Sequence, residues 1–239
     1  MEANTTGYRN TALGDSSLKL NSNGFENTGI GVYSLDANTT GDRNTAVGVN
    51  TLSTNTTGSN STAIGVNALY ASTSGYENTA VGKDALLSNS SGYQNTAQGN
   101  TALRSNTTGS RNTAMGVGSL YSNTTGSNNT AQGYNALNAN TTGTQNTALG
   151  DAAMTANTTG SNNTAIGKNA LQIVTSGSQN TALGVGAGSA NSQGTGNIFV
   201  GYMAGSQETG SNKLYIDNSS TTKPLISGDF EQDLSLIHI

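Results

Sequence analysis

Residues 146–162 read NTALGDAAMTANTTGSN, and this phrase of 17 residues recurs along almost the whole chain. We number its repeat positions 1 to 17 and call each copy, from Asn10 onward, a coil. Glycine occupies repeat position 15 from Gly7 to Gly194. It also occupies repeat position 5 in twelve consecutive coils, without insertion or deletion: Gly14, Gly31, Gly48, Gly65, Gly82, Gly99, Gly116, Gly133, Gly150, Gly167, Gly184 and Gly201. A fixed short period predicts a solenoid, in which every repeat stacks on its neighbours.

The composition agrees with a folded repeat protein of low charge. Of 239 residues, 32% are hydrophobic, 5% aromatic and 9% charged. Disordered chains usually owe their disorder to high net charge and low hydrophobicity, whereas the polarity here comes from Asn, Thr, Ser and Gly. A flexible Gly/Ser/Thr-rich linker is the alternative. It does not explain why leucine returns every 17 residues, so we expect a folded chain.

Several classes of function are disfavoured. The net charge of −4 has no clustered patch behind it, which argues against nucleic acid or an anionic membrane as partner. There is no cysteine, and the single histidine, His238, lies outside the repeats. The aspartates of the repeats are scattered over several repeat positions: Asp15, Asp36, Asp42, Asp84 and Asp151. We therefore predict no enzymatic activity, no metal site and no cofactor.

The repeat predicts an all-β coil. Repeat positions 1–5, such as NTAVG at residues 44–48, predict a short strand that ends at a glycine. Repeat positions 8 and 9 combine a small residue with Leu, and positions 12–15 are a turn of the type Asn-Thr-Thr-Gly. We expect two short strands and two polar corners in each coil. The fold class is then a parallel β-solenoid of about twelve coils.

The repeat positions also separate the inside of a coil from its outside. Position 3 is Ala in ten coils and position 9 is Leu in nine, which predicts a tight interior shared by both. Neighbouring residues of a strand point to opposite faces, so position 4 should lie outside. An exposed stripe of this length predicts an interaction surface. Its members, apart from two glutamines, are aliphatic or Met: Leu13, Ile30, Val47, Ile64, Val81, Gln98, Met115, Gln132, Leu149, Ile166 and Leu183.

The phrases NTAVG (44–48) and NTAIG (163–167) resemble the repeats of trimeric autotransporter adhesin heads. That resemblance implies left-handed parallel β-rolls in which three chains surround an axis. The longer form with Asn-Thr-Thr-Gly resembles repeats of phage tail fibres and of large bacterial surface proteins. Residues 196–230 look like the stretch that precedes an endosialidase-type intramolecular chaperone domain. The implied location is extracellular, on a bacterial cell surface or a virion tail.

The domain boundaries follow from where the repeat fails. Residues 1–211 are the predicted rod, and 212–233 a neck with a strand near KLYID at 213–217. In the last coil Phe199 replaces the usual Ala and Gly205 replaces Leu, and Gly188 replaces Leu in the coil before it, so we expect a wider, reorganised coil. Residues 234–239 resemble the translation of a sequencing adapter, and we expect no packed role for 235–239. The chain starts in mid-repeat, which suggests an excerpt from a longer polypeptide.

Two functions from different classes remain. The first is a structural and adhesive segment of a homotrimeric fibre whose seam is repeat position 4, with Gln98 and Gln132 near the axis. The second is ice binding through the Thr of repeat position 2, present in eleven coils. A host surface protein or a glycan is left open as ligand. Candidate ligand contacts are aromatic residues in exposed positions, with loop packing as their alternative role: Tyr70, Tyr121, Tyr76, Tyr93, Tyr8 and Phe25.

Overall fold

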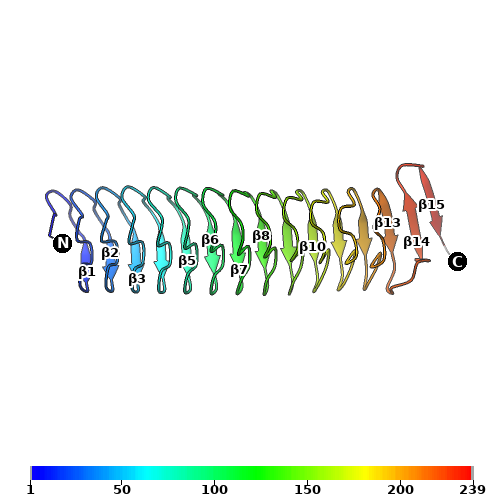
Figure 1. Cartoon of the computed structure of the whole chain (residues 1–239), viewed down its shortest axis with the longest axis horizontal. Coiled ribbons are helices and arrows are strands. Elements are labelled where there is room, and N and C mark those ends of the chain that lie inside the picture. The colour runs from blue at the N-terminus through cyan, green and yellow to red at the C-terminus, as the bar shows by residue number, and fades with distance from the viewer. Residues whose placement is uncertain (1, 238–239) are drawn as a thin grey trace. The chain divides into compact units, whose positions relative to one another are not determined.

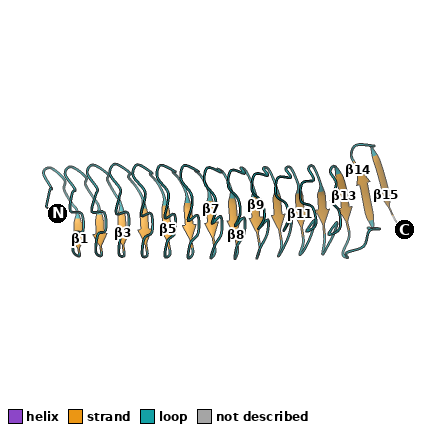
Figure 2. Cartoon of the chain, viewed as in Figure 1, coloured by secondary structure: helices purple, strands orange, loops and turns teal. Residues whose placement is uncertain are grey.

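The computed structural model describes residues 2–237, and these form strands, turns and loops without any helix (Figure 2). Contacts within the chain divide it into two compact units, Met1–Thr125 and Gly126–Ile239, and each is described by itself. The repeat provides the reason for the absence of helix. Glycines recur at two positions of nearly every coil, and repeat positions 2 and 4 carry mostly threonine and aliphatic residues.

Each complete coil contributes one strand of three residues at repeat positions 2–4 (Figure 1). The first unit contains β1 Thr11–Leu13, β2 Thr28–Ile30, β3 Thr45–Val47, β4 Thr62–Ile64, β5 Thr79–Val81, β6 Thr96–Gln98 and β7 Thr113–Met115. The second contains β8 Thr130–Gln132, β9 Thr147–Leu149, β10 Thr164–Ile166, β11 Thr181–Leu183 and β12 Ile198–Val200. Within each unit consecutive strands pair in parallel with equivalent residues aligned, as in Thr11 with Thr28. The predicted parallel β-solenoid of about twelve turns is confirmed.

The prediction of two strands in each coil was wrong. Repeat positions 8 and 9 lie in a turn, although Leu69 N still donates to Ala85 O of the next coil at 3.0 Å. Three residues of a coil turn the chain by adopting positive φ: Asn60 (59°), Asn67 (57°) and Leu69 (52°) illustrate repeat positions 17, 7 and 9. This conformation costs a residue with a side chain about 1–2 kcal/mol. For Leu69 the full burial of its side chain offsets that cost.

The interior of each coil is as narrow as the repeat predicts. Ala46 at position 3 and Leu52 at position 9 have no exposed surface, and their equivalents in the other coils are mostly the same. Position 5 needs glycine because the backbones of successive coils nearly touch there. A Cβ on Gly14, whose φ is +135°, would lie 2.6 Å from the carbonyl oxygen of Gly31. The methyl group of Ala at position 3 and the side chain of Leu at position 9 therefore face each other and fill the core.

Two columns of buried asparagines bind the coils together. At repeat position 1, Asn163 Nδ2 donates to Gly177 O at 2.8 Å, and Asn163 Oδ1 accepts from Asn180 N at 2.9 Å. At repeat position 12, Asn106 Nδ2 donates to Asn89 Oδ1 at 2.7 Å. These bonds satisfy buried polar groups that would otherwise each cost about 1–3 kcal/mol. Asparagine therefore recurs at these two repeat positions because its side chain forms hydrogen bonds inside the coil.

The position-12 column is interrupted where the repeat loses its asparagine. Ser72 follows Asn55, and Val174 follows Asn157, so neither Asn55 Oδ1 nor Asn157 Oδ1 receives the usual amide. Within residues 2–237 both of these oxygens, and Ser72 Oγ, are buried without a hydrogen-bond partner. The interruptions leave local weak points in an otherwise satisfied ladder.

The core around Phe199 is filled differently from the core of the other coils. Phe199 is fully buried at repeat position 3, where other coils have Ala. Cβ atoms added to Gly188 and Gly205 would both collide with its ring. The expected reorganisation therefore consists of one large side chain at repeat position 3 and two glycines in place of leucine at repeat position 9. The parallel register continues through it, with Thr181 opposite Ile198.

The parallel ladder extends beyond Ser211, where we expected the rod to end. Strand β13 (Lys213–Ile216) pairs in parallel with β12, and only then do β14 (Ile226–Asp229) and β15 (Leu234–Ile237) add in antiparallel fashion (Figure 1). The expectation of no packed role for 235–239 was wrong for residues 235–237, whose backbone pairs with β14. The side chains of Leu234 and Leu236 are more than half exposed. Residues 238 and 239, including His238, lie outside the described part.

Candidate functional site

Repeat position 4 lies on the outer face of the sheet, as predicted from strand alternation. Nine of its eleven candidate residues are exposed: Leu13, Ile30, Ile64, Val81, Gln98, Met115, Gln132, Leu149 and Leu183. The two others, Val47 and Ile166, are half-buried. Because the strands are in register, these side chains form one column along each unit.

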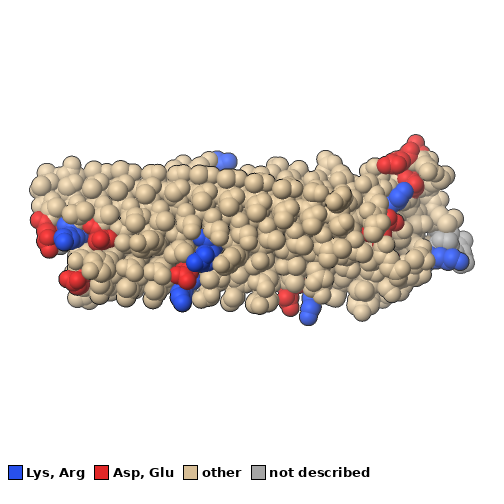
Figure 3. Space-filling model, viewed as in Figure 1, with Lys and Arg blue, Asp and Glu red and all other residues tan. Residues whose placement is uncertain are grey.

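A second apolar column was missed by sequence reasoning. Repeat position 6 carries exposed side chains two residues beyond position 4: Val32, Val49, Val66, Val117, Tyr134, Val185 and Tyr202. The other coils place Asp, Lys or Asn at this position, which obscured the pattern, although valine in five of twelve coils was a usable signal. We call positions 4 and 6 together the outer apolar strip. Figure 3 shows that charged side chains form only a few small groups on the face in view.

The threonines of repeat position 2 lie beside the strip on the same face of the sheet. Thr62 pairs in register with Thr45 and Thr79, and each of these side chains is half-buried. The row ends at β12, where Ile198 replaces Thr. The sheet therefore presents a regular row of hydroxyl groups next to a row of aliphatic side chains.

The aromatic residues of repeat position 16 pack against one another. Tyr76 and Tyr93 stack with ring centroids 5.0 Å apart and an interplanar angle of 2°, and Tyr8 stacks on Phe25 in the same way. Arg111 lies 5.5 Å from the centroid of Tyr93. These contacts stabilise successive corners of the coil. They give Tyr76 and Tyr93 a packing role, the alternative that we considered for them.

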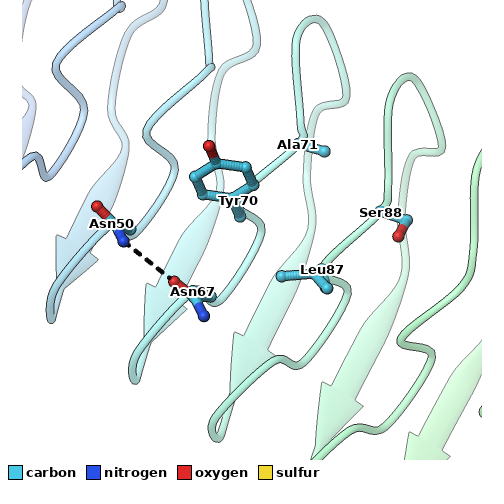
Figure 4. Close-up of a pocket in the computed structure, with 6 residues that line it drawn as sticks. All are labelled: Asn50, Asn67, Tyr70, Ala71, Leu87 and Ser88. Atoms are coloured by element: carbon cyan, nitrogen blue, oxygen red, sulfur yellow. Dashed lines mark hydrogen bonds between the residues drawn. The ribbon is translucent and has the colours of Figure 1, made fainter.

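The two tyrosines of repeat position 10 differ in how their rings are covered. Arg104 lies 5.7 Å from the ring centroid of Tyr121. Tyr70 has no aromatic or cationic side chain on its ring in the described part of the chain, and it is 39% exposed. It borders an open groove of about 430 Å³ (Figure 4), lined by Asn50, Asn67, Tyr70, Ala71, Leu87 and Ser88.

A polar cluster joins the last coil to the C-terminal strands. Lys213 Nζ donates to Asp229 Oδ2 at 2.6 Å, and this bond raises the pKa of Lys213 and lowers the pKa of Asp229. Tyr215 Oη donates to Glu208 Oε2 at 2.8 Å. Partial burial, with a smaller contribution from Glu208, raises the pKa of Tyr215 to about 12. We interpret this cluster as structural, because it ties β13 to β14.

Residues 2–237 contain no group of three His, Cys, Asp or Glu side chains arranged to hold a metal ion. The described part also has no helix of the length and hydrophobicity that crossing a membrane requires. Comparison of the chain with protein-family models, curated proteins and solved structures gives no match. The arguments for function therefore rest on the surfaces described above.

Proposed function

We propose that this chain is a structural and adhesive segment of an extracellular homotrimeric fibre, assembled through the outer apolar strip. The observation that carries the proposal is the strip itself. Its Val, Ile, Leu and Met side chains are mostly 36–48% exposed in an otherwise polar chain. An exposed apolar strip of this kind is typical of an interface, because water contact with it is unfavourable.

The residues that interrupt the strip fit a seam between identical chains. Gln98 and Gln132 are exposed at repeat position 4. Around a threefold axis, three copies of one glutamine can donate and accept hydrogen bonds among themselves. At repeat position 6, Lys168 Nζ lies 3.7 Å from Asp151 Oδ2, so these two charges face each other within one chain. Most of the other exposed residues of the coils are polar, which suits the outside of a fibre.

The row of threonines supports a second candidate function, ice binding. Repeat position 2 places equivalent hydroxyl and methyl groups in register on successive coils, as Thr62 and Thr79 illustrate. A regular, weakly charged array of this kind is suited to ordering water. In the trimer, the interface at repeat position 4 would also bury this row, because both positions lie on the same face of the sheet. Trimer formation and ice binding therefore cannot both use this face.

The oligomeric state tests the proposal. We suggest light scattering on the chain after removal of a trimerising tag, with Ile64→Asp, Ile166→Asp as the test variant. The matched control, Ser74→Asp, Ser176→Asp, adds the same charges in the same coils at exposed turn positions. We expect a trimer for the wild type and the control, and dissociation of the test variant. A stable wild-type monomer would refute the seam.

Ice-recrystallisation inhibition distinguishes the second candidate. A monomeric wild type that inhibits recrystallisation, and loses this activity in Thr62→Tyr, Thr79→Tyr, would favour ice binding. The bulky rings disturb the flat row without adding charge. A trimer without such activity supports the fibre segment.

A further inference from the structure

We propose that the groove beside Tyr70 is a binding site for neutral saccharides, with the free face of the Tyr70 ring as its platform. The groove draws on three successive coils of the first unit (Figure 4). Asn50 comes from the first coil, Asn67, Tyr70 and Ala71 from the second, and Leu87 and Ser88 from the third.

The ring of Tyr70 differs from those of the other candidate tyrosines because, within residues 2–237, no aromatic or cationic side chain lies on it. Tyr121 occupies the equivalent repeat position and contacts the Arg104 guanidinium, while Tyr76 and Tyr93 stack on each other. Tyr70 Oη makes no hydrogen bond within residues 2–237, so the side chain is held by packing alone. An exposed aromatic face attracts the polarised C–H groups on one side of a pyranose ring.

The lining of the groove also supplies hydrogen-bonding groups. Asn50 Nδ2 donates to Asn67 Oδ1 at 3.3 Å (Figure 4). Asn67 Nδ2 donates in turn to Asp84 Oδ1 at 2.9 Å. This row orients both amides. Each amide nitrogen keeps a second N–H, Asn50 Oδ1 accepts nothing within the described residues, and Ser88 Oγ is also unpaired there. Paired donors and acceptors of this kind match the vicinal hydroxyl groups of a sugar.

The lining also determines the charge of the ligand. None of its six residues is charged, and the nearest charge in the amide row is the carboxylate of Asp84. Among these lining residues an anionic sugar would meet no cation to compensate the loss of its hydration. One aromatic face, one aliphatic side chain and uncharged amides therefore favour an uncharged hexopyranose.

This inference deepens the adhesive part of the proposed function, since it names a ligand class, but the groove lies within one chain. Binding in a monomer would support the site even if the trimer fails. A trimer that binds no sugar would overturn the site and leave the fibre intact.

Saturation-transfer NMR with defined oligosaccharides tests the proposal. The probes are maltotetraose, cellotetraose and mannotetraose, with sialyllactose as the anionic comparison. The variants are Tyr70→Ala, Tyr70→Phe and the matched control Tyr121→Ala, which removes the same side chain from the equivalent position. Circular dichroism verifies that each variant keeps the β-solenoid, which we expect because Tyr70 is partly exposed.

We expect at least one neutral tetrasaccharide to bind, with affinity reduced about tenfold by Tyr70→Ala. Tyr70→Phe should retain binding because the ring face, not the hydroxyl, makes the contact. Tyr121→Ala should also retain it. Binding of sialyllactose alone, no binding of any neutral probe, or an equal loss in Tyr70→Ala and Tyr121→Ala would overturn the proposal.

Discussion

The ring of Phe199 occupies the space that a side chain on Gly188 would need: a Cβ there would lie 2.7 Å from Cε2 of Phe199. The same ring also leaves no room for a side chain on Gly205, which lies in the same coil as Phe199. One phenylalanine thus replaces the volume of two leucines, one on each side. The three residues form a single packing unit, and their substitutions should not act independently.

Phe199→Ala alone should lower the free energy of unfolding by about 3–5 kcal/mol, because it leaves a cavity between two glycines. Gly188→Leu alone should also destabilise the chain, through collision with the ring. The triple variant Phe199→Ala, Gly188→Leu, Gly205→Leu restores the common repeat and should recover most of the loss. Urea unfolding of all variants measures these differences. If the triple variant loses as much unfolding free energy as the single variants together, then Phe199 does not occupy the space of the two missing leucines.

Restoring asparagine at repeat position 12 should stabilise the chain. In Val174→Asn the new amide would donate to the buried Asn157 Oδ1, which has no partner among the described residues. A gain of about 1 kcal/mol is expected from urea unfolding. The control is Ile173→Asn, the same change of chemistry at an exposed neighbour that faces no buried acceptor. A loss of stability in Val174→Asn but not in Ile173→Asn would show that the oxygen is already satisfied.

The C-terminal cluster should weaken at alkaline pH. The pKa of Tyr215 is raised to about 12 from an ordinary value of 10.0, so between these pH values the folded chain holds a proton that the unfolded chain has lost. Stability therefore falls as pH rises through this window. The raised pKa of Lys213 acts in the same direction. Absorbance of tyrosinate, followed with circular dichroism, should show a late ionisation step that belongs to Tyr215.

Two variants assign that late titration. Tyr215→Phe should remove it, and Glu208→Gln should shift it to lower pH, since the carboxylate favours the protonated phenol. If all nine tyrosines ionise together while the β-sheet signal persists, the hydrogen bond between Tyr215 and Glu208 does not hold in solution.

Much of the fold was predictable because equivalent residues have equivalent neighbours in a solenoid. Ala at repeat position 3 in ten coils indicates a tight wall, Leu at position 9 indicates the interior, and alternation along a strand then places position 4 outside. Leu69, Ala63 and Ile64 lie as this reasoning requires. The spacing of the glycines was sufficient to predict the parallel register.

The corners and the candidate sites were less accessible to sequence reasoning. Leu69 adopts positive φ although leucine has no preference for it, because burial of its side chain outweighs the local cost. The difference between Tyr70 and Tyr121 depends on which side chain the preceding coil contributes at the same repeat position, Ser53 before Tyr70 and Arg104 before Tyr121. Sequence reasoning placed both in one class. The exposed valines of repeat position 6, such as Val66, were hidden among charged residues at the same position.

The constant offset of 17 residues between equivalent residues that pair in neighbouring strands of the repeats has a consequence for how such a chain changes over generations. Loss or gain of one whole repeat, for example residues 78–94, joins a repeat position 17 to a repeat position 1 and creates no unmatched edge. Unequal exchange between the near-identical gene segments that encode the repeats produces such changes directly. The length of the molecule is thus an inherited variable that can be adjusted in single steps, while each remaining residue keeps its surroundings.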